Sequence, residues 1–199
     1  MSYKKMSIDV RRLTYLAMLT ALVVVLQFAG SFIRFGTFSI SLVLVPIVVG
    51  AAICGSLSGA WLGLIFGIIV LVSGDAAAFL TINPFGTVLT VIVKGTLAGL
   101  ASGLVYKFLE KKNKYVAVFS SAIVCPIVNT GIFLLGCLVF FMDTISEWAA
   151  AAGFANAGSY MILGLAGGNF LFELLFNICL APIIVTLINL APKLINKRK

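Results

Sequence analysis

The sequence predicts an all-α integral membrane protein, built as one compact bundle of six transmembrane helices that takes in residues 1–199. Of the 199 residues, 62% are apolar and only 10% are charged. The mean hydropathy is +1.19. Apolar runs follow one another almost from end to end and leave no room for a soluble domain.

Three spans are predicted in the first half of the chain. The first covers residues 13–32, and at about 1.5 Å per residue it is long enough to cross a hydrocarbon core about 30 Å thick. Because the polar residues 1–12 precede it, we expect this span to stay as an anchor and not to be cleaved as a signal peptide. The second span covers residues 38–54 and contains Pro46, and the third covers residues 59–72, which is short for a full crossing.

Three further spans are predicted in the second half, over residues 85–108, 115–142 and 159–190. Residues 73–84 are semi-polar at both ends and apolar in the middle, which predicts a loop that folds back onto the protein. Residues 143–158 form a long connection, and we expect Pro182 to bend the last span.

The basic residues predict the orientation of the bundle. With six spans, both termini lie on the same side, and twelve basic residues lie there: Lys4, Lys5, Arg11, Arg12, Lys107, Lys111, Lys112, Lys114, Lys193, Lys197, Arg198 and Lys199. The opposite side carries only Arg34. Because cytoplasmic loops are enriched in Lys and Arg, we expect both termini to be cytoplasmic.

Other residue types argue against several functions. The net charge of +8 could suggest a nucleic-acid partner, but the basic residues flank apolar segments, where a topology signal explains them better. The four cysteines are isolated within apolar runs and lack the spacing of a metal or redox motif. The chain has no histidine, the commonest general base and a common metal ligand. We therefore expect no metal site, no cofactor, no nucleic-acid partner and no enzymatic activity.

Small residues recur at intervals of four. They form two series, Ala51, Gly55, Gly59, Gly63 and Gly67, and Gly95, Gly99 and Gly103. Such faces let helix backbones approach closely within lipid, so we expect them to pack the second, third and fourth spans together. A shorter pair, Ala17 and Ala21, lies near the cytoplasmic end of the first span, beside the basic N-terminus.

Polar side chains cluster at membrane depth in the C-terminal half. Asn169, Glu173 and Asn177 recur every fourth residue and therefore share one helix face. A carboxylate at this depth needs a partner, and Lys94, the basic residue deep within a hydrophobic run, is the obvious one. Lys94 lies about 14 Å from the outer end of its span, and Asn169 and Glu173 lie about 15 to 21 Å from theirs. With Asn129 near the middle of the fifth span, these groups can share one layer.

This layer predicts a small-molecule pocket, with Lys94, Asn129, Asn169, Glu173, Thr90 and Phe133 as its candidate binding residues. Thr90 lies on the same face of its span as Lys94, and Phe133 lies one turn from Asn129. The alternative is purely structural: Lys94 and Glu173 pair with each other, and each Asn only bonds a neighbouring helix.

Three segments carry a family resemblance. They are the Ala17-x-x-x-Ala21 pair, residues 44–50 (LVPIVVG) with the glycine-rich span that follows, and residues 123–131 (IVCPIVNTG). Together with six short spans and cytoplasmic termini, they resemble the substrate-binding S components of energy-coupling-factor (ECF) vitamin transporters over almost the whole chain. The pattern is most similar to the branch that includes riboflavin and pantothenate binders.

The resemblance implies a high-affinity substrate-binding subunit for uptake of a vitamin or vitamin precursor, located in the bacterial plasma membrane. It implies a ligand site near the outer face, formed by the outer loops and the fourth to sixth spans. It also implies contact through Ala17 and Ala21 with a transmembrane coupling protein that works with two cytoplasmic ATPases. The chain has no Gly-x-x-x-x-Gly-Lys-[Ser/Thr] phosphate loop, so ATP hydrolysis belongs to those partners.

Two further expectations concern how such a subunit works. The small-residue surface of the first three spans predicts the face that contacts the coupling protein. Residues 31–37 and 73–84 are expected to form a lid over the pocket, because Gly36, Gly74 and the Asn83-Pro84 turn can absorb a closing movement. The alternative function is a stand-alone secondary carrier that uses Glu173 and Lys94 as proton-exchanging groups; the lack of a detectable internal repeat counts against it.

Overall fold

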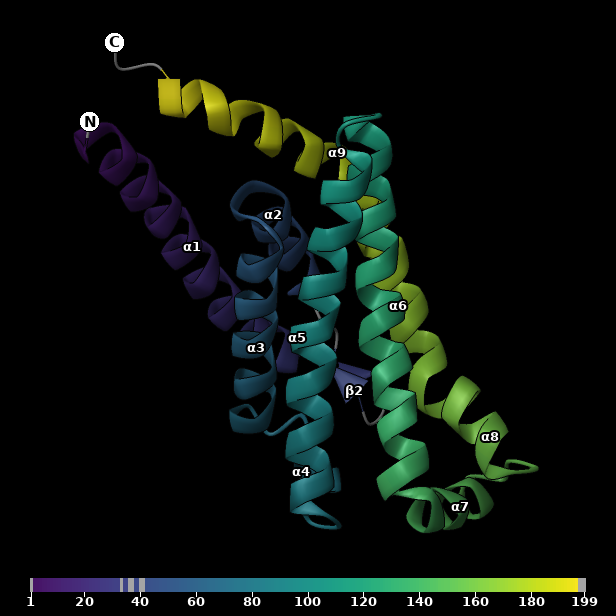
Figure 1. The fold of residues 1–199 in the computed structure, drawn as a ribbon. Coiled ribbons are helices and arrows are strands. Elements are labelled where there is room, and N and C mark those ends of the chain that lie inside the picture. Colours follow the sequence, from purple (N-terminus) through teal and green to yellow (C-terminus); the bar gives the residue numbers. More distant parts are fainter. Residues whose placement is uncertain (1, 33, 36–37, 40–41, 197–199) are drawn as a thin grey trace.

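The computed structural model shows a bundle of helices that pack side by side (Figure 1). It describes the backbone of residues 2–32, 34–35, 38–39 and 42–196, and the side chains of residues 10, 12–32 and 42–189. The longer helices are α1 (Ser2–Ser31), α2 (Leu44–Cys54), α3 (Ser56–Val72), α5 (Pro84–Leu109), α6 (Lys114–Phe140), α7 (Met142–Ala151) and α9 (Gly168–Asn196). The short elements are α4 (Ala77–Leu80), α8 (Ala157–Ser159), the π-helical stretch η1 (Tyr160–Gly167), and the antiparallel strands β1 (Arg34–Phe35) and β2 (Phe38–Ser39).

The predicted all-α membrane class is confirmed. Within the described residues, four segments are long and apolar enough to cross a membrane: Arg12–Ser31, Pro84–Leu109, Lys114–Phe140 and Ala157–Asn189. Two shorter apolar helices, α2 and α3, have 11 and 17 residues.

Two helices begin where capping residues in the sequence allow it. Asn83 precedes Pro84, and its side chain accepts a hydrogen bond from the backbone N–H of Gly86 at 2.9 Å. Asn113 caps α6 in the same way, accepting from the N–H of Tyr115 at 2.9 Å. The two caps fix where α5 and α6 begin. The predicted starts of the fourth and fifth spans, residues 85 and 115, each lie within one residue of these positions.

The second span and the connection after the fifth differ from the prediction. The helix expected from residue 38 begins only at Leu44, which puts Pro46 in the first turn, where a missing N–H costs no helical bond. Residues 143–151, which were expected to be part of a long connection, belong to a helix, α7. Ile145 and Ala149 are buried on one side of α7 while Asp143 is exposed, and this amphipathic helix lies across the end of the bundle (Figure 1).

The predicted glycine packing is confirmed at the contact between α3 and α5. A methyl group added at Gly63 would overlap the backbone carbonyl oxygen of Gly95, and one added at Gly59 would overlap that of Gly99. The two helix backbones therefore touch, which only glycine permits. On its other side α5 packs against α6, where Ser121 Oγ donates to the carbonyl oxygen of Ser102 at 2.9 Å and Ser102 Oγ donates back to that of Ser121 at 3.3 Å.

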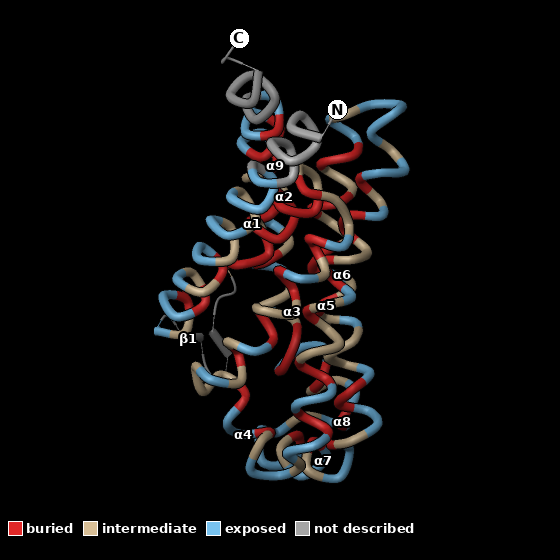
Figure 2. Tube along the Cα trace, turned by 60° about the vertical axis from the view of Figure 1, so that its left-hand side comes forward, coloured by how far each residue is buried: buried red, intermediate tan, exposed pale blue. Residues whose placement is uncertain are grey.

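Of the four long apolar segments in the described residues, Arg12–Ser31 of α1 is the least buried. Figure 2 shows it mostly exposed or half-buried, whereas most of α2 is buried. Arg12 donates a hydrogen bond to the carbonyl oxygen of Cys54 at the end of α2, and Trp61 of α3 donates to Thr20 Oγ1 at 3.3 Å. Among the described residues, nothing covers a wide face of α1.

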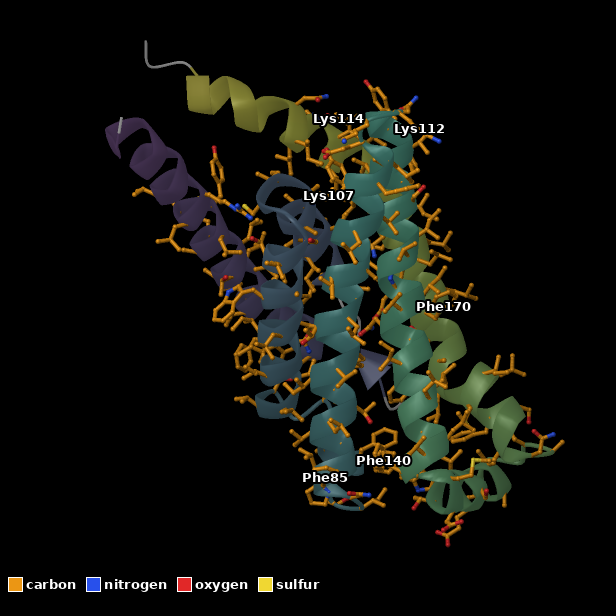
Figure 3. All side chains as sticks on the ribbon, in the orientation of Figure 1. Phe85, Lys107, Lys112, Lys114, Phe140 and Phe170 are labelled. Carbon is orange, nitrogen blue, oxygen red and sulfur yellow. The ribbon has the colours of Figure 1, made fainter. Side chains whose placement is uncertain are left out.

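The two ends of the bundle differ in composition. Both termini lie at one end, where Figure 3 also places Lys107, Lys112 and Lys114. Phe85 and Phe140 lie at the opposite end, close to α4 and α7. Helix α9 changes direction in Figure 1, and its sequence contains Pro182, a residue type that typically bends a helix.

Candidate functional site

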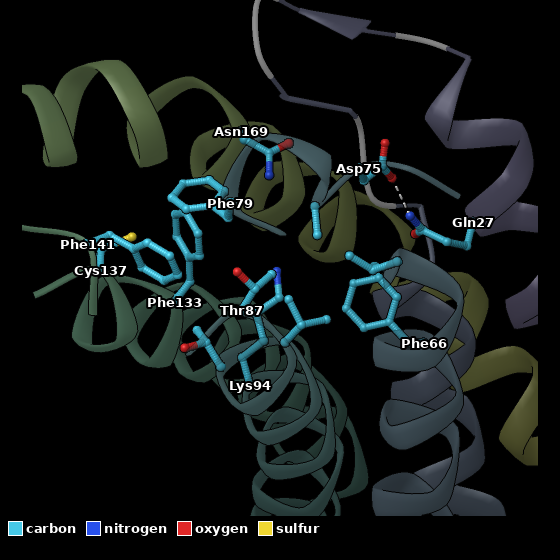
Figure 4. A pocket seen from close by; sticks show the side chains of 14 residues that line it. Gln27, Phe66, Asp75, Phe79, Thr87, Lys94, Phe133, Cys137, Phe141 and Asn169 are labelled. Atoms are coloured by element: carbon cyan, nitrogen blue, oxygen red, sulfur yellow. Dashed lines mark hydrogen bonds between the residues drawn. The ribbon is translucent and has the colours of Figure 1, made fainter. Parts of the chain in front are cut away.

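A cavity lies inside the half of the bundle away from the termini (Figure 4). Its volume is about 70 Å³. Its walls come from α1, α3, α5, α6, α9, the segment between α3 and α5, and the residue that joins α6 to α7. The lining residues are Gln27, Phe66, Val70, Asp75, Ala76, Phe79, Thr87, Thr90, Val91, Lys94, Phe133, Cys137, Phe141 and Asn169. Segments far apart in the sequence therefore enclose one space.

Lys94 places a cation among aromatic rings at this cavity. Its Nζ lies 5.3 Å from the ring centroid of Phe133 and 5.8 Å from that of Phe66, within the range of cation–π attraction. Two acidic residues lie nearby: Asp75 lines the same cavity, and Glu173 bonds to Asn169 of the cavity wall. Ring faces and nearby carboxylates together explain how an ammonium group is held inside an apolar bundle.

Asn169 and Glu173 form a connected pair on α9. Asn169 lines the cavity, and its Nδ2 donates to Glu173 Oε1 at 3.0 Å. The spacing of four residues puts both on one helix face, as predicted. Glu173 is only 1% exposed and is not among the residues that line the cavity, and its hydrogen bond fixes the direction of the Asn169 amide.

Two further hollows adjoin this cavity. The inner one, of about 50 Å³, shares Lys94, Phe133 and Asn169 with it and adds Asn129, which is 4% exposed. The Oδ1 atom of Asn129 is buried and has no hydrogen-bond partner among the described residues. The outer one, of about 360 Å³, shares Asp75 and Phe79 with the cavity and extends along α7 and η1. The three hollows thus adjoin one another, and the outer one reaches α7 at the end of the bundle.

Phe79 is the centre of an aromatic cluster between the cavity and the outer hollow. Its ring meets those of Phe133, Phe141 and Trp148 edge to face, with centroid distances of 5.7, 5.0 and 5.5 Å. Phe79 belongs to α4, inside the segment predicted as a lid, so the cluster ties that segment to α6 and α7. The other predicted lid segment, residues 31–37, lies partly outside the described residues.

The structure brings the predicted binding residues together. Thr90, Lys94, Phe133 and Asn169 line the main cavity, Asn129 lines the inner hollow, and Glu173 bonds to Asn169. Sequence reasoning missed Gln27, Asp75 and Phe79, although a buried glutamine in an apolar helix is a signal that could have been followed. Within the described residues no group of three potential metal ligands lies together.

Ala17 and Ala21, the predicted partner contacts, are far from this site. Both are exposed on α1, next to the exposed side chains of Leu13, Met18 and Leu22. They therefore belong to the uncovered face of α1.

The sequence matches the family described as "ECF transporter, substrate-specific component" over residues 11–185. The chain belongs to this family. No close match is found among curated proteins. The fold is similar to that of a solved structure of ThiT from Listeria monocytogenes, with a TM-score of 0.67 and 22% identity, and the match covers 94% of this chain and 97% of ThiT.

Membership of this family makes the chain a transport component, and its apolar helices make it a multi-pass membrane protein. The predicted resemblance to ECF S components is confirmed. At 22% identity the similarity to ThiT concerns the fold, so the site must be interpreted from the residues of this chain.

Proposed function

We propose that this S component captures a vitamin or vitamin precursor in the cavity around Lys94, for uptake across the bacterial plasma membrane. One observation carries the proposal: a cationic side chain and an amide oriented by a carboxyl group are enclosed with aromatic rings in the interior of a membrane protein of this family. Few polar groups at fixed positions among aromatic side chains are typical of a small-molecule site.

The chemistry of the walls indicates what the compound presents to them. Lys94 is suited to an acidic or carbonyl group, because a hydrogen bond from an ammonium is strengthened by its charge. Asn169, held by Glu173, and Asn129 can bond the polar edge of the compound. Phe133 and Phe79 offer ring surface to a planar portion. Riboflavin-like and pantothenate-like compounds are both candidates.

We place both termini in the cytoplasm and count six spans, with α2 and α3 as the two short ones. The lysines at the end of the bundle that holds the termini support this orientation (Figure 3). The cavity then opens toward the outer face, and the segment between α3 and α5 covers it as a lid.

The partners proposed for this subunit are a transmembrane coupling protein and two cytoplasmic ATPases. The uncovered face of α1, with the small side chains of Ala17 and Ala21, supports a helix–helix contact with the coupling protein. The family description as a substrate-specific component favours this role over a stand-alone carrier that exchanges protons at Glu173 and Lys94.

The test is to purify the protein in detergent from cells grown in rich medium and to identify any co-purifying small molecule by mass spectrometry. We expect a vitamin-class compound in near-stoichiometric amount. Titration of the stripped protein with riboflavin, pantothenate, thiamine, biotin, nicotinamide and pyridoxine, followed by tryptophan fluorescence and calorimetry, then gives the affinity. If no vitamin co-purifies and none of these six compounds binds, the proposed function is wrong.

A further inference from the structure

Gln27 occupies an unusual position on α1. Its side chain is 2% exposed, although most of the described side chains of α1 are exposed and its neighbours Val25 and Phe28 are 62% and 38% exposed. Among the described residues, it is the α1 residue that lines the main cavity. Burying an amide costs free energy unless its groups form hydrogen bonds, so this position calls for partners on both sides of the amide.

Asp75 supplies one of these partners and fixes the orientation of the amide. Gln27 Nε2 donates to Asp75 Oδ2 at 2.6 Å (Figure 4). A carboxylate only accepts hydrogen bonds, so the NH₂ group of Gln27 must face Asp75 and its oxygen must point elsewhere. The assignment of nitrogen and oxygen in this amide therefore follows from chemistry.

The other half of the amide has no partner among the described residues. Gln27 Oε1 is buried and accepts no hydrogen bond from them. A buried carbonyl without a donor is costly, and such groups are rare in folded proteins. Since Gln27 is part of the cavity wall, a compound in the cavity can supply the missing donor.

We propose that Gln27 is a ligand-binding residue whose Oε1 accepts a hydrogen bond from an N–H or O–H group of the bound compound, with Asp75 as the residue that positions it. This inference rests on the proposed function and narrows its ligand. The compound carries a donor on the edge that faces Gln27 and an acceptor on the part that faces Lys94, with ring surface against Phe66 or Phe133.

The same contact links the ligand to α1. Gln27 is ten and six residues along the helix from Ala17 and Ala21, which places it on a different face of α1 from them. One face of α1 thus meets the ligand and another is available to a partner. Asp75 lies in the segment proposed as a lid, so the Gln27–Asp75 bond joins α1 to that segment.

The experiment compares Gln27→Met with Thr20→Val in binding of the compound that the wild-type protein binds tightest among riboflavin, pantothenate, thiamine, biotin, nicotinamide and pyridoxine. Methionine has a similar length but no polar group, so it leaves no buried amide without partners. Thr20 is a matched control, because its hydroxyl lies on the same helix and bonds Leu16 and Trp61 outside the cavity. We expect Gln27→Met to weaken binding by about tenfold, the loss typical of one hydrogen bond, and Thr20→Val to change it less than about twofold.

A second pair of variants tests the positioning role of Asp75. Asp75→Asn keeps an oxygen that can accept from Gln27 Nε2, whereas Asp75→Ala removes it. We expect Asp75→Asn to retain most of the affinity and Asp75→Ala to lose as much as Gln27→Met. This comparison also stands if Gln27→Met does not purify as a monodisperse protein.

The outcomes separate the inference from the proposed function. Wild-type affinity in Gln27→Met, with a vitamin still bound, overturns the role of Gln27 and leaves the proposed function intact. If Asp75→Asn and Asp75→Ala lose the same affinity, the positioning role is wrong. Such a result would mean that binding needs the charge of Asp75 and not only an oxygen that accepts from Gln27. Binding of none of the six compounds to the wild-type protein overturns the proposed function and this inference with it.

Discussion

Phe79→Ala should loosen the segment that covers the cavity. The Phe79 ring makes edge-to-face contacts with Phe133, Phe141 and Trp148. Each such pair contributes about 0.5 to 1.5 kcal/mol, so removing the ring lowers the free energy of local opening by about 1.5 to 4.5 kcal/mol. At about 1.4 kcal/mol per factor of ten, amide hydrogen exchange in residues 73–84 should become about ten- to a thousandfold faster.

The assay is hydrogen exchange followed by mass spectrometry on the purified protein in detergent, with peptides that cover residues 73–84. Phe85→Ala is the matched control, because Phe85 lies at the same end of the bundle but is 73% exposed and has no ring contact among the described residues. If exchange in residues 73–84 is the same in Phe79→Ala as in Phe85→Ala, the aromatic cluster does not hold this segment and the reasoning is refuted.

Two other predictions concern the helix contacts. Gly63→Ala should lower the melting temperature, because the new methyl group overlaps the carbonyl oxygen of Gly95 and such overpacking costs about 1 to 3 kcal/mol; Gly131→Ala, with nothing within 4 Å of the added carbon, should be neutral or stabilising. Equal melting temperatures for the two variants would mean that the α3–α5 contact is not tight. Ala21→Trp should abolish vitamin uptake in cells while leaving ligand affinity within about twofold, whereas Leu104→Trp, at an exposed position of α5, should leave both unchanged. Normal uptake by Ala21→Trp would remove the partner contact from this face of α1.

Much of the fold could be predicted because its signals are local. Long apolar runs indicate helices, and capping residues mark where two of them begin: Asn83 with Pro84 for α5, and Asn113 for α6. The glycine series predicted the α3–α5 contact for the same reason, since a spacing of four places small residues on one face. The beginning of α2 was missed because hydropathy alone does not separate an apolar extended segment from an apolar helix. Helix α7 was missed because its apolar face is short and is followed by a run of alanine and glycine.

Only part of the candidate site could be predicted from the sequence. Lys94, Asn169 and Glu173 stand out because a charge or an amide at membrane depth is costly. Depth counted along each span was enough to put them in one layer. Gln27 and Phe79 reach the same cavity from α1 and from α4, and only the packing of α1 against α2 and α3 and of α4 against α5 brings them there. A single glutamine or phenylalanine carries no periodic pattern that would reveal such a long-range contact.

The most direct test of a vitamin site around Lys94 is the affinity of Lys94→Met compared with Lys112→Met. The two changes remove the same charge, one at the cavity and one at the exposed end of the bundle (Figure 3). A hydrogen bond from a charged group contributes about 1.5 to 3 kcal/mol, so we expect Lys94→Met to bind the co-purifying compound about 10- to 100-fold more weakly and to remain monodisperse. Lys112→Met should bind it like the wild-type protein. Wild-type affinity in a well-folded Lys94→Met protein would contradict the account and move the ligand away from this cavity.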